Sequence, residues 1–434
     1  MIKDGRRLDD RDMKLLISTY ACAPDRGSEQ AVGWNWTTGA HRLGHQVWAL
    51  ASTVHREAIE AVCEKDKDLA GINWIFPEVA GWPLRPGVEP VWERTYNFLW
   101  QFAARRHART LQREVRFDAI HHLTWGGVRA PTFLGSLGAP LIVGPIGGGE
   151  TSPAALRDRL TARSRLVERI RDLSNASITV NPITRVGLAQ AKVIFVKTSD
   201  TARLLTDAMR RKSNIFMELT LQHRQACAPR LPPGPPRLLF AGRLLYWKGA
   251  HIAIHALAQL LPRVPEARLT IVGKGPEGER LKAQAAAMNL GDRIEFVPWL
   301  AQQHLFTLYA DHHLLLLPSL HDSSGNVVLE ALSHGLPVMC LDIGGPRDIV
   351  TPQAGIVVST SGRDTLGVAA AMADEMQRLF AEPERLAALS AGALKRASEF
   401  IASDRIDALY RVAAAAIGAP VRPAMLENAV SCAS

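Results

Sequence analysis

The sequence predicts an α/β protein built from two Rossmann-like domains that face each other across a cleft. Short apolar runs typical of buried strands, such as residues 14–20 and 45–50, alternate with helical stretches and glycine-bearing loops. The same alternation restarts after residue 236. With 434 residues, the chain is long enough to form two domains that each bury a core.

The domain boundary is predicted at a proline-rich segment, Leu231-Pro232-Pro233-Gly234-Pro235-Pro236. We therefore expect a first domain over residues 1–228, a linker over 229–236 and a second domain over 237–410. The last helix of the second domain is expected to pack back on the first domain. Residues 411–434 are expected to form a tail.

Composition indicates a cytoplasmic protein with an anionic partner. The first ten residues are charged, no apolar run approaches the roughly 18 residues of a membrane span, and the five cysteines are scattered without a CxxC pair. The net charge of +9 needs either an anionic partner or a compositional origin, the use of arginine for lysine in a GC-rich genome. No RNA-binding or DNA-reading motif is present, so an anionic membrane surface or an anionic substrate is favoured over nucleic acid.

One segment of the first domain combines aromatic and basic residues. An interfacial contact with an anionic inner membrane would use such an edge, and a helix packed in the core would explain it equally well. The segment contains Trp82, Trp92, Tyr96, Phe98, Trp100 and Phe102, followed by Arg105, Arg106, Arg109, Arg113 and Arg116.

The most informative stretch runs from Leu314 to Leu332. Four leucines predict a buried strand, and the polar loop after it leads into a helix with Ser323 or Ser324 as N-cap. Gly325 permits close approach to the backbone, and the free N–H groups at the helix start favour a phosphate. Glu330, just over one turn further along, can accept hydrogen bonds from vicinal hydroxyls. These features indicate a nucleotide-sugar site.

Two loops of the first domain are also candidates. Gly27-Ser28-Glu29 lies in the loop after the first strand, where the absence of a GxGxxG fingerprint argues against an NAD-dependent dehydrogenase. Gly147-Gly148-Gly149 forms a loop without side-chain bulk, which suits close approach to a ligand or a hinge.

The second domain resembles the retaining glycosyltransferases of family 4, which have the GT-B fold. The resemblance covers about 170 positions, through motifs in the family's order. The motifs are Ala241-Gly242-Arg243-Leu244 with Lys248-Gly249, Val272-Gly273-Lys274-Gly275-Pro276, Arg293-Ile294-Glu295-Phe296, Asn326-Val327-Val328-Leu329-Glu330-Ala331 with Gly335-Leu336-Pro337-Val338, and Gly344-Gly345.

The resemblance implies a nucleotide diphosphate-sugar donor (UDP or GDP), no metal ion and no other cofactor. Arg243 and Lys248 are expected at the diphosphate, Asp322 at the donor sugar and Glu330 at the ribose. His121 or His122 would approach the sugar from the first domain, which faces the acceptor. The remaining expected donor contacts are Gly27, Ser28, Gly242, Gly275, Trp299, Leu300, Gly325, Asn326 and Val327.

Three positions depart from the family pattern. Asp322 stands where the first of two glutamates is usual, and Pro298 stands where a glycine is common near the base pocket. The usual His-x-His is an adjacent pair, His121-His122, and neighbours on a strand point to opposite faces. Which histidine faces the cleft therefore stays open.

The expected activity is hexosyl transfer to a lipid-linked glycan, in exopolysaccharide or lipopolysaccharide synthesis, on the cytoplasmic face of the inner membrane. Two alternatives share the fold. A sugar-nucleotide 2-epimerase would consume the donor without an acceptor. A non-catalytic subunit would bind nucleotide and support a partner transferase, and Asp322 in place of glutamate is the feature that favours it.

Overall fold

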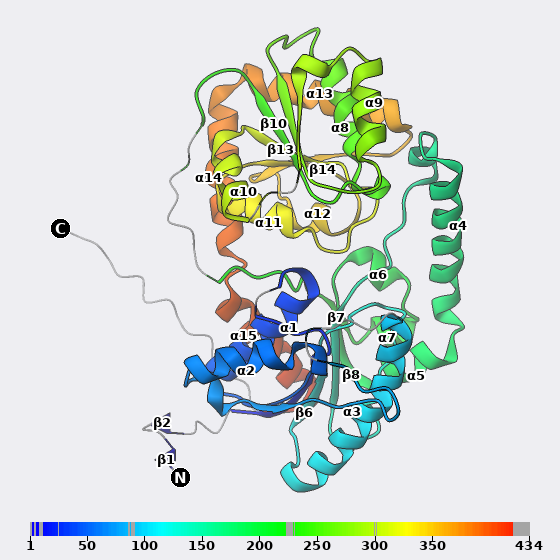
Figure 1. Cartoon of the computed structure of the whole chain (residues 1–434), viewed down its shortest axis with the longest axis vertical. Helices are drawn as coiled ribbons and strands as arrows, with labels where there is room; N and C mark the ends of the chain where they lie inside the picture. The colour runs from blue at the N-terminus through cyan, green and yellow to red at the C-terminus, as the bar shows by residue number, and fades with distance from the viewer. Residues whose placement is uncertain are drawn as a thin grey trace, which may run out of the picture.

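The computed structural model describes residues 2–3, 6–7, 12–24, 26–85, 87, 92–222, 229, 231–298, 300 and 302–419. Two α/β domains, each with its own parallel sheet, are stacked along the long axis of the molecule (Figure 1). The predicted pair of Rossmann-like domains is therefore confirmed. Two residue pairs near the start, β1 (Ile2–Lys3) and β2 (Arg6–Arg7), form a separate antiparallel ladder.

The first domain contains a seven-stranded sheet in the order β5-β4-β3-β6-β7-β8-β9, with parallel pairing throughout. The central strands of this sheet are mostly buried, because helices cover both faces. In chain order they are β3 (Lys14–Ser18), β4 (Gln46–Leu50), β5 (Asn73–Ile75), β6 (Ala119–His122), β7 (Leu141–Ile146), β8 (Ala191–Val196) and β9 (Ser213–Ile215).

The second domain contains a six-stranded parallel sheet in the order β12-β11-β10-β13-β14-β15. The four leucines of β13 are fully buried near its centre, as their apolar run predicts. The strands are β10 (Arg237–Ala241), β11 (Arg268–Val272), β12 (Ile294–Val297), β13 (Leu314–Leu317), β14 (Val338–Leu341) and β15 (Gly355–Val358).

Fifteen α-helices connect the described strands or cover the sheets. Those within residues 28–210 are α1 (Ser28–Arg42), α2 (Arg56–Lys65), α3 (Glu93–Val115), α4 (Ala162–Ala176), α5 (Pro182–Gln190), α6 (Ser199–Arg203) and α7 (Asp207–Arg210). Those after residue 249 are α8 (Ala250–Leu260), α9 (Gly278–Ala287), α10 (Gln302–Asp311), α11 (Asn326–Ser333), α12 (Gly344–Ile349), α13 (Thr365–Ala381), α14 (Pro383–Ser398) and α15 (Ala402–Ile417). Among the described helices, none is long and apolar enough to cross a bilayer.

The last helix returns to the first domain. Ile406, Leu409 and Tyr410 of α15 are buried in the same apolar cluster as Ile17 of β3 and Phe195 of β8. In Figure 1 this helix leaves the second domain and lies under the sheet of the first. It continues to Ile417, so the expected tail boundary at residue 411 falls inside the helix.

The aromatic and basic segment is mostly a core helix. Tyr96 and Trp100 on α3 are buried, and Trp82 packs edge-on against Tyr96 at a ring distance of 5.4 Å. The aromatic residues left exposed are Trp92 and Phe102. The packed-helix interpretation therefore accounts for most of this segment, because the inner face of α3 fills the space over the sheet.

Truncation of Leu409, which is fully buried in α15, tests how strongly this helix stabilises the first domain. The Leu409→Ala variant should lower the free energy of unfolding by about 2–5 kcal/mol, because it leaves a cavity between α15 and the sheet. Urea denaturation measures the change. Val412→Ala, at an exposed position of the same helix, is the matched control and should change stability by less than about 0.5 kcal/mol.

Candidate functional site

A cavity of about 310 Å³ lies between the two domains and is lined by residues from both. Ser28, Glu29 and Val32 come from the start of α1, and Lys197 follows β8. The second domain supplies the loops that follow β10 and β13. Open parallel sheets bind ligands beyond the carboxyl ends of their strands, and both sheets present such ends to this cavity.

Two loops of the second domain are held against each other beside the cavity. The amide of Leu320 donates a hydrogen bond of 2.7 Å to the carbonyl of Trp247. Gly249 has a left-handed backbone (φ 77°), and a Cβ added there would lie 1.9 Å from the carbonyl oxygen of Pro318. Only glycine fits this contact, which brings the loop after β10 to the loop after β13.

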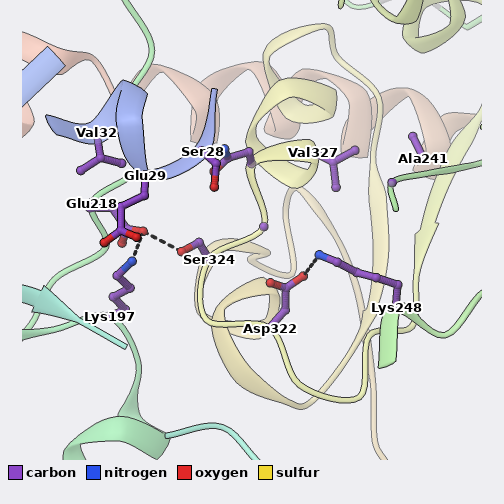
Figure 2. A pocket seen from close by; sticks show the side chains of 13 residues that line it. Ser28, Glu29, Val32, Lys197, Glu218, Ala241, Lys248, Asp322, Ser324 and Val327 are labelled. Carbon is purple, nitrogen blue, oxygen red and sulfur yellow. Dashed lines mark hydrogen bonds and ion pairs between the residues drawn. The ribbon is translucent and has the colours of Figure 1, made fainter. Parts of the chain in front are cut away.

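This contact sets Lys248 and Asp322 opposite each other. The Lys248 ammonium forms an ion pair with one carboxylate oxygen of Asp322, and both side chains are largely shielded from solvent. Figure 2 shows the pair at one side of the cavity. Both residues, expected from the motif pattern to contact a donor, thus lie together at the cavity.

The start of α11 also borders the cavity, through Gly325, Asn326 and Val327. Gly325 has a left-handed backbone (φ 104°) and is itself the N-cap, without a side-chain capping bond. The predicted cap by Ser323 or Ser324 is therefore wrong. Without a side-chain cap, the first amides of the helix are oriented to receive an anion.

The two serines instead bind buried carboxylates of the first domain. Ser323 donates to Glu150, and Ser324 donates to Glu218 at 2.6 Å. His321, in the same loop, donates through Nε2 to Glu168 at 2.9 Å. Three carboxylates from the first domain thus hold the loop that carries Asp322.

Hydrogen bonds keep two of these carboxylates ionised although both are buried. Burial raises the pKa of Glu150, but donors led by Ser323 and Thr198 outweigh it and hold the pKa below its usual range. Burial likewise raises the pKa of Glu168, yet hydrogen bonding and charge from His321, with a bond from Tyr246, lower it to about 2. Tyr246 lies two positions before Lys248, so Glu168 contacts both donor-side loops.

Lys197 is a second cation at the cavity, and its role was missed in the sequence. Its ammonium donates to Glu218 at 2.6 Å, and Figure 2 shows Lys197 and Ser324 pointing to the same carboxylate. Burial alone would lower the pKa of Lys197, but Glu218 and then Glu29 raise it above its usual range. A polar residue directly after a parallel strand is the signal that could have identified Lys197.

Glu330 lines a neighbouring cavity of about 560 Å³, together with Gly27 and Ser28. The hydroxyl of Tyr309 donates to Glu330 at 3.0 Å. Asn326 and Ser28 border both cavities, so a ligand with its diphosphate at Lys248 could extend to Glu330. The expected ribose contact is compatible with this arrangement.

Neither histidine of the adjacent pair lines these cavities. His121 is fully buried, donates through Nε2 to the carbonyl of Gly144 at 2.7 Å and accepts from the hydroxyl of Tyr410 at 2.9 Å. His122 is buried too, and burial lowers the pKa of each ring to about 4. The structure therefore places both rings inside the first domain, away from the expected sugar contact.

The other expected residues are spread more widely. Gly242 borders the interdomain cavity, whereas Gly275 lines a separate cavity of about 260 Å³ beside Pro298. Arg243 is exposed and lines none of these three cavities. Leu300 packs against the core of the second domain, and Trp299 lies outside the described residues.

Within the described ranges, no group of three or more His, Cys, Asp or Glu side chains is arranged to hold a metal ion. The charged groups at the interdomain cavity are two lysines, each paired with a carboxylate, and Glu29. Such cations can neutralise a diphosphate directly.

Comparison with known proteins relates the second domain to glycosyltransferases. Residues 224–396 match the family model described as glycosyl transferases group 1. The D-inositol 3-phosphate glycosyltransferase of Streptomyces bingchenggensis is 36% identical over 180 residues, which span 39% of this chain and 38% of that relative. The chain thus spans well under half of the relative's length. The predicted resemblance of the second domain to glycosyltransferases is confirmed, at the level of group 1.

Solved structures agree on the fold. Sucrose-phosphate synthase from Thermosynechococcus elongatus matches 93% of this chain and all of its own, with a TM-score of 0.61 and 18% identity. The Anabaena protein HepE, solved in complex with UDP, matches 93% of this chain and all of its own, with a TM-score of 0.57 and 15% identity. The predicted GT-B fold is confirmed.

Stability should depend on pH through Glu168. Its pKa is lowered from 4.5 to about 2 in the folded protein, so ionised Glu168 stabilises the fold above about pH 4.5. This contribution, on the order of 3 kcal/mol, is lost as the pH falls towards about 2. Glu168→Gln should therefore be much less stable than wild type at neutral pH, with a difference that shrinks below about pH 4.5.

Denaturant unfolding of both proteins over this pH range measures the difference. Glu279→Gln is the control, because Glu279 is a surface residue paired only with Lys282. Its effect should be small and independent of pH. A constant difference between wild type and Glu168→Gln across the range would contradict the assigned ionisation.

Proposed function

Because residues 224–396 match the family model of group 1 glycosyl transferases, we propose that the chain transfers a hexose from a nucleotide diphosphate-sugar to a glycan acceptor. One observation carries the proposal. Lys248, Asp322 and the open amides of α11 face a single cavity between two α/β domains. This is the arrangement of charge and N–H donors that a departing nucleotide diphosphate requires.

Transfer places negative charge on the leaving phosphate and positive charge on the anomeric carbon. Lys248 and the amides at Asn326 and Val327 would stabilise the phosphate, with Lys197 as a cation from the first domain. Preorganised charge is most effective where the closed cleft excludes water. In this proposal the reaction requires no metal ion or other cofactor.

The rest of the donor is assigned by position. Asp322 would bind hydroxyls of the donor sugar, and Glu330 would bind the ribose in the adjoining cavity. The base is expected to be uracil or guanine. Transfer is proposed to retain the anomeric configuration on one face of the sugar, without a protein nucleophile, and neither buried histidine is given a role in it.

The acceptor is proposed to be a lipid-linked glycan of exopolysaccharide or lipopolysaccharide synthesis. The protein would act on the cytoplasmic face of the inner membrane, as a peripheral protein without a span. The net charge of +9 supports attraction to an anionic leaflet. An acceptor anchored in that leaflet would enter the cleft from the side of the first domain.

Mass spectrometry of reaction products tests the activity directly. The purified protein is incubated with a panel of UDP- and GDP-sugars, with and without membrane extract as acceptor. A glycosylated product that needs the extract supports transfer. An altered sugar nucleotide formed without extract would indicate the 2-epimerase, and donor binding without turnover would indicate a non-catalytic subunit.

Lys248→Ala should lower kcat on the order of 100-fold or more, because one cation at the leaving phosphate is lost. Arg243 is the second expected phosphate contact, but its side chain is exposed. The Arg243→Ala variant is therefore assayed separately from Lys248→Ala. Lys395→Ala, at an exposed lysine of α14 that lines none of the three cavities, is the control and should leave the rate unchanged. Wild-type rates for both Lys248→Ala and Arg243→Ala would exclude the phosphate site.

Glu330→Gln should raise the donor KM with little change in kcat. A ribose contact persists from ground state to transition state, so its loss weakens binding without slowing the chemical step. Steady-state kinetics with varied donor measure both constants. A selective fall in kcat would instead assign Glu330 to the reacting centre.

A further inference from the structure

Helix α4 is an amphipathic helix with its apolar face turned outwards. Leu166, Val167, Ile170 and Leu173 are exposed, from 45% at Val167 to 72% at Leu173. The buried positions of the helix are all polar. The spacing i, i+4, i+7 of three of these residues places them along one stripe, which we call the α4 stripe.

The inner face of α4 is fixed to the protein by polar contacts. Glu168 accepts from Tyr246 and His321, and Asn175 donates to the carbonyl of Gly149 at 3.2 Å. Arg157 makes a two-pronged ion pair with Asp172. These contacts therefore fix the orientation of α4, with the apolar side chains of the α4 stripe facing the solvent and not the core.

The charges around the α4 stripe have one sign. Arg163, Arg165 and Arg169 are exposed, and none of them forms an ion pair within the described part of the chain. The two acidic residues of α4 are engaged with the protein, Glu168 on the inner face and Asp172 with Arg157. A partner for this surface must therefore be apolar at its centre and anionic around it.

We propose that the α4 stripe docks on an anionic lipid bilayer. Its four apolar side chains would enter the headgroup and acyl boundary, and the three arginines would contact anionic headgroups. Glu168, on the opposite face of α4, contacts the residues next to Asp322 and near Lys248. In Figure 1, α4 runs along one edge of the molecule beside the junction of the domains. Docking there places the interdomain cavity close to the membrane.

Membrane docking through the α4 stripe deepens the proposed function. It rests on that function only because a lipid-linked acceptor is the reason for the protein to bind a bilayer. Helix α3, for which the sequence left a membrane contact and a packed core helix equally open, buries its aromatic face and keeps exposed arginines. A comparison of the two helices therefore separates docking through α4 from general attraction of a basic protein. Vesicle binding is measured without donor or acceptor, so its failure would leave the transferase proposal untouched.

Co-sedimentation with vesicles tests the proposal. Wild type should bind vesicles of mixed phosphatidylglycerol and phosphatidylcholine at low salt and bind pure phosphatidylcholine much more weakly. Leu166→Ser, Ile170→Ser and Leu173→Ser combined should weaken binding on the order of 100-fold. The matched control combines Ile215→Ser, Val357→Ser and Val412→Ser, at exposed apolar positions of other elements, and should bind like wild type.

Charge is tested in the same assay. Replacing Arg163, Arg165 and Arg169 with glutamine should weaken binding on the order of 100-fold at low salt, and salt near 1 M should weaken wild-type binding similarly. Replacing Arg106, Arg109 and Arg113 of α3 is the control, with a much smaller expected effect. Donor affinity, measured by calorimetry with UDP and GDP, should be the same in all variants.

Three results would overturn the proposal. Wild type that ignores anionic vesicles at every salt concentration excludes bilayer docking. Equal losses for the α4 and α3 arginine variants would show that net charge alone is responsible. A concentration-dependent dimer in sedimentation velocity, abolished by the serine variant of the α4 stripe, would assign the stripe to a second copy of the chain.

Discussion

Three buried carboxylates of the first domain hold one loop of the second. Glu168, Glu150 and Glu218 accept hydrogen bonds from His321, Ser323 and Ser324 respectively. Ionised carboxylates are stable in such a buried place only while their donors are present, and each of these three has at least one donor on the other domain. The position of Asp322, between these anchored residues, therefore depends on the contact between the domains.

Two lysines and three carboxylates line the interdomain cavity, so both cations already have acidic neighbours without a ligand. Lys248 is paired with Asp322, and Lys197 is paired with Glu218. A diphosphate would compete with the carboxylates for the two ammonium groups and would add negative charge at the start of α11. The carboxylates thus position the two ammonium groups at the cavity. Once a diphosphate bound the lysines, the carboxylates would be able to accept hydrogen bonds from other groups, such as the hydroxyls of a sugar.

Helix α4 links this site to the surface. Its inner side carries Glu168, which binds residues of both donor-side loops, and its outer side carries apolar residues and arginines. A helix fixed through polar contacts on one face can leave its apolar face open, because the fold does not need that face for its core. The same helix therefore connects the geometry of the cavity with the surface assigned to a bilayer.

Local patterns in the sequence by themselves determined the two α/β domains, the buried strand Leu314–Leu317 and the placement of Lys248 and Asp322 in loops after strands. Strand periodicity, glycine positions and motif order are properties of short segments, so they can be read without knowing the fold. The family resemblance followed from the same segments.

Only the tertiary structure decided which polar residues face one another. The bonds of Ser324, His321 and Ser323 to their carboxylates span 106, 153 and 173 positions of sequence. No local pattern encodes such pairs, so the sequence predicts Ser323 or Ser324 as a helix cap and does not indicate the pairing of Lys197 with Glu218. Packing likewise decided that His121 lies under α15 and that α4 turns its apolar face outward, because burial depends on the neighbours that the completed fold supplies.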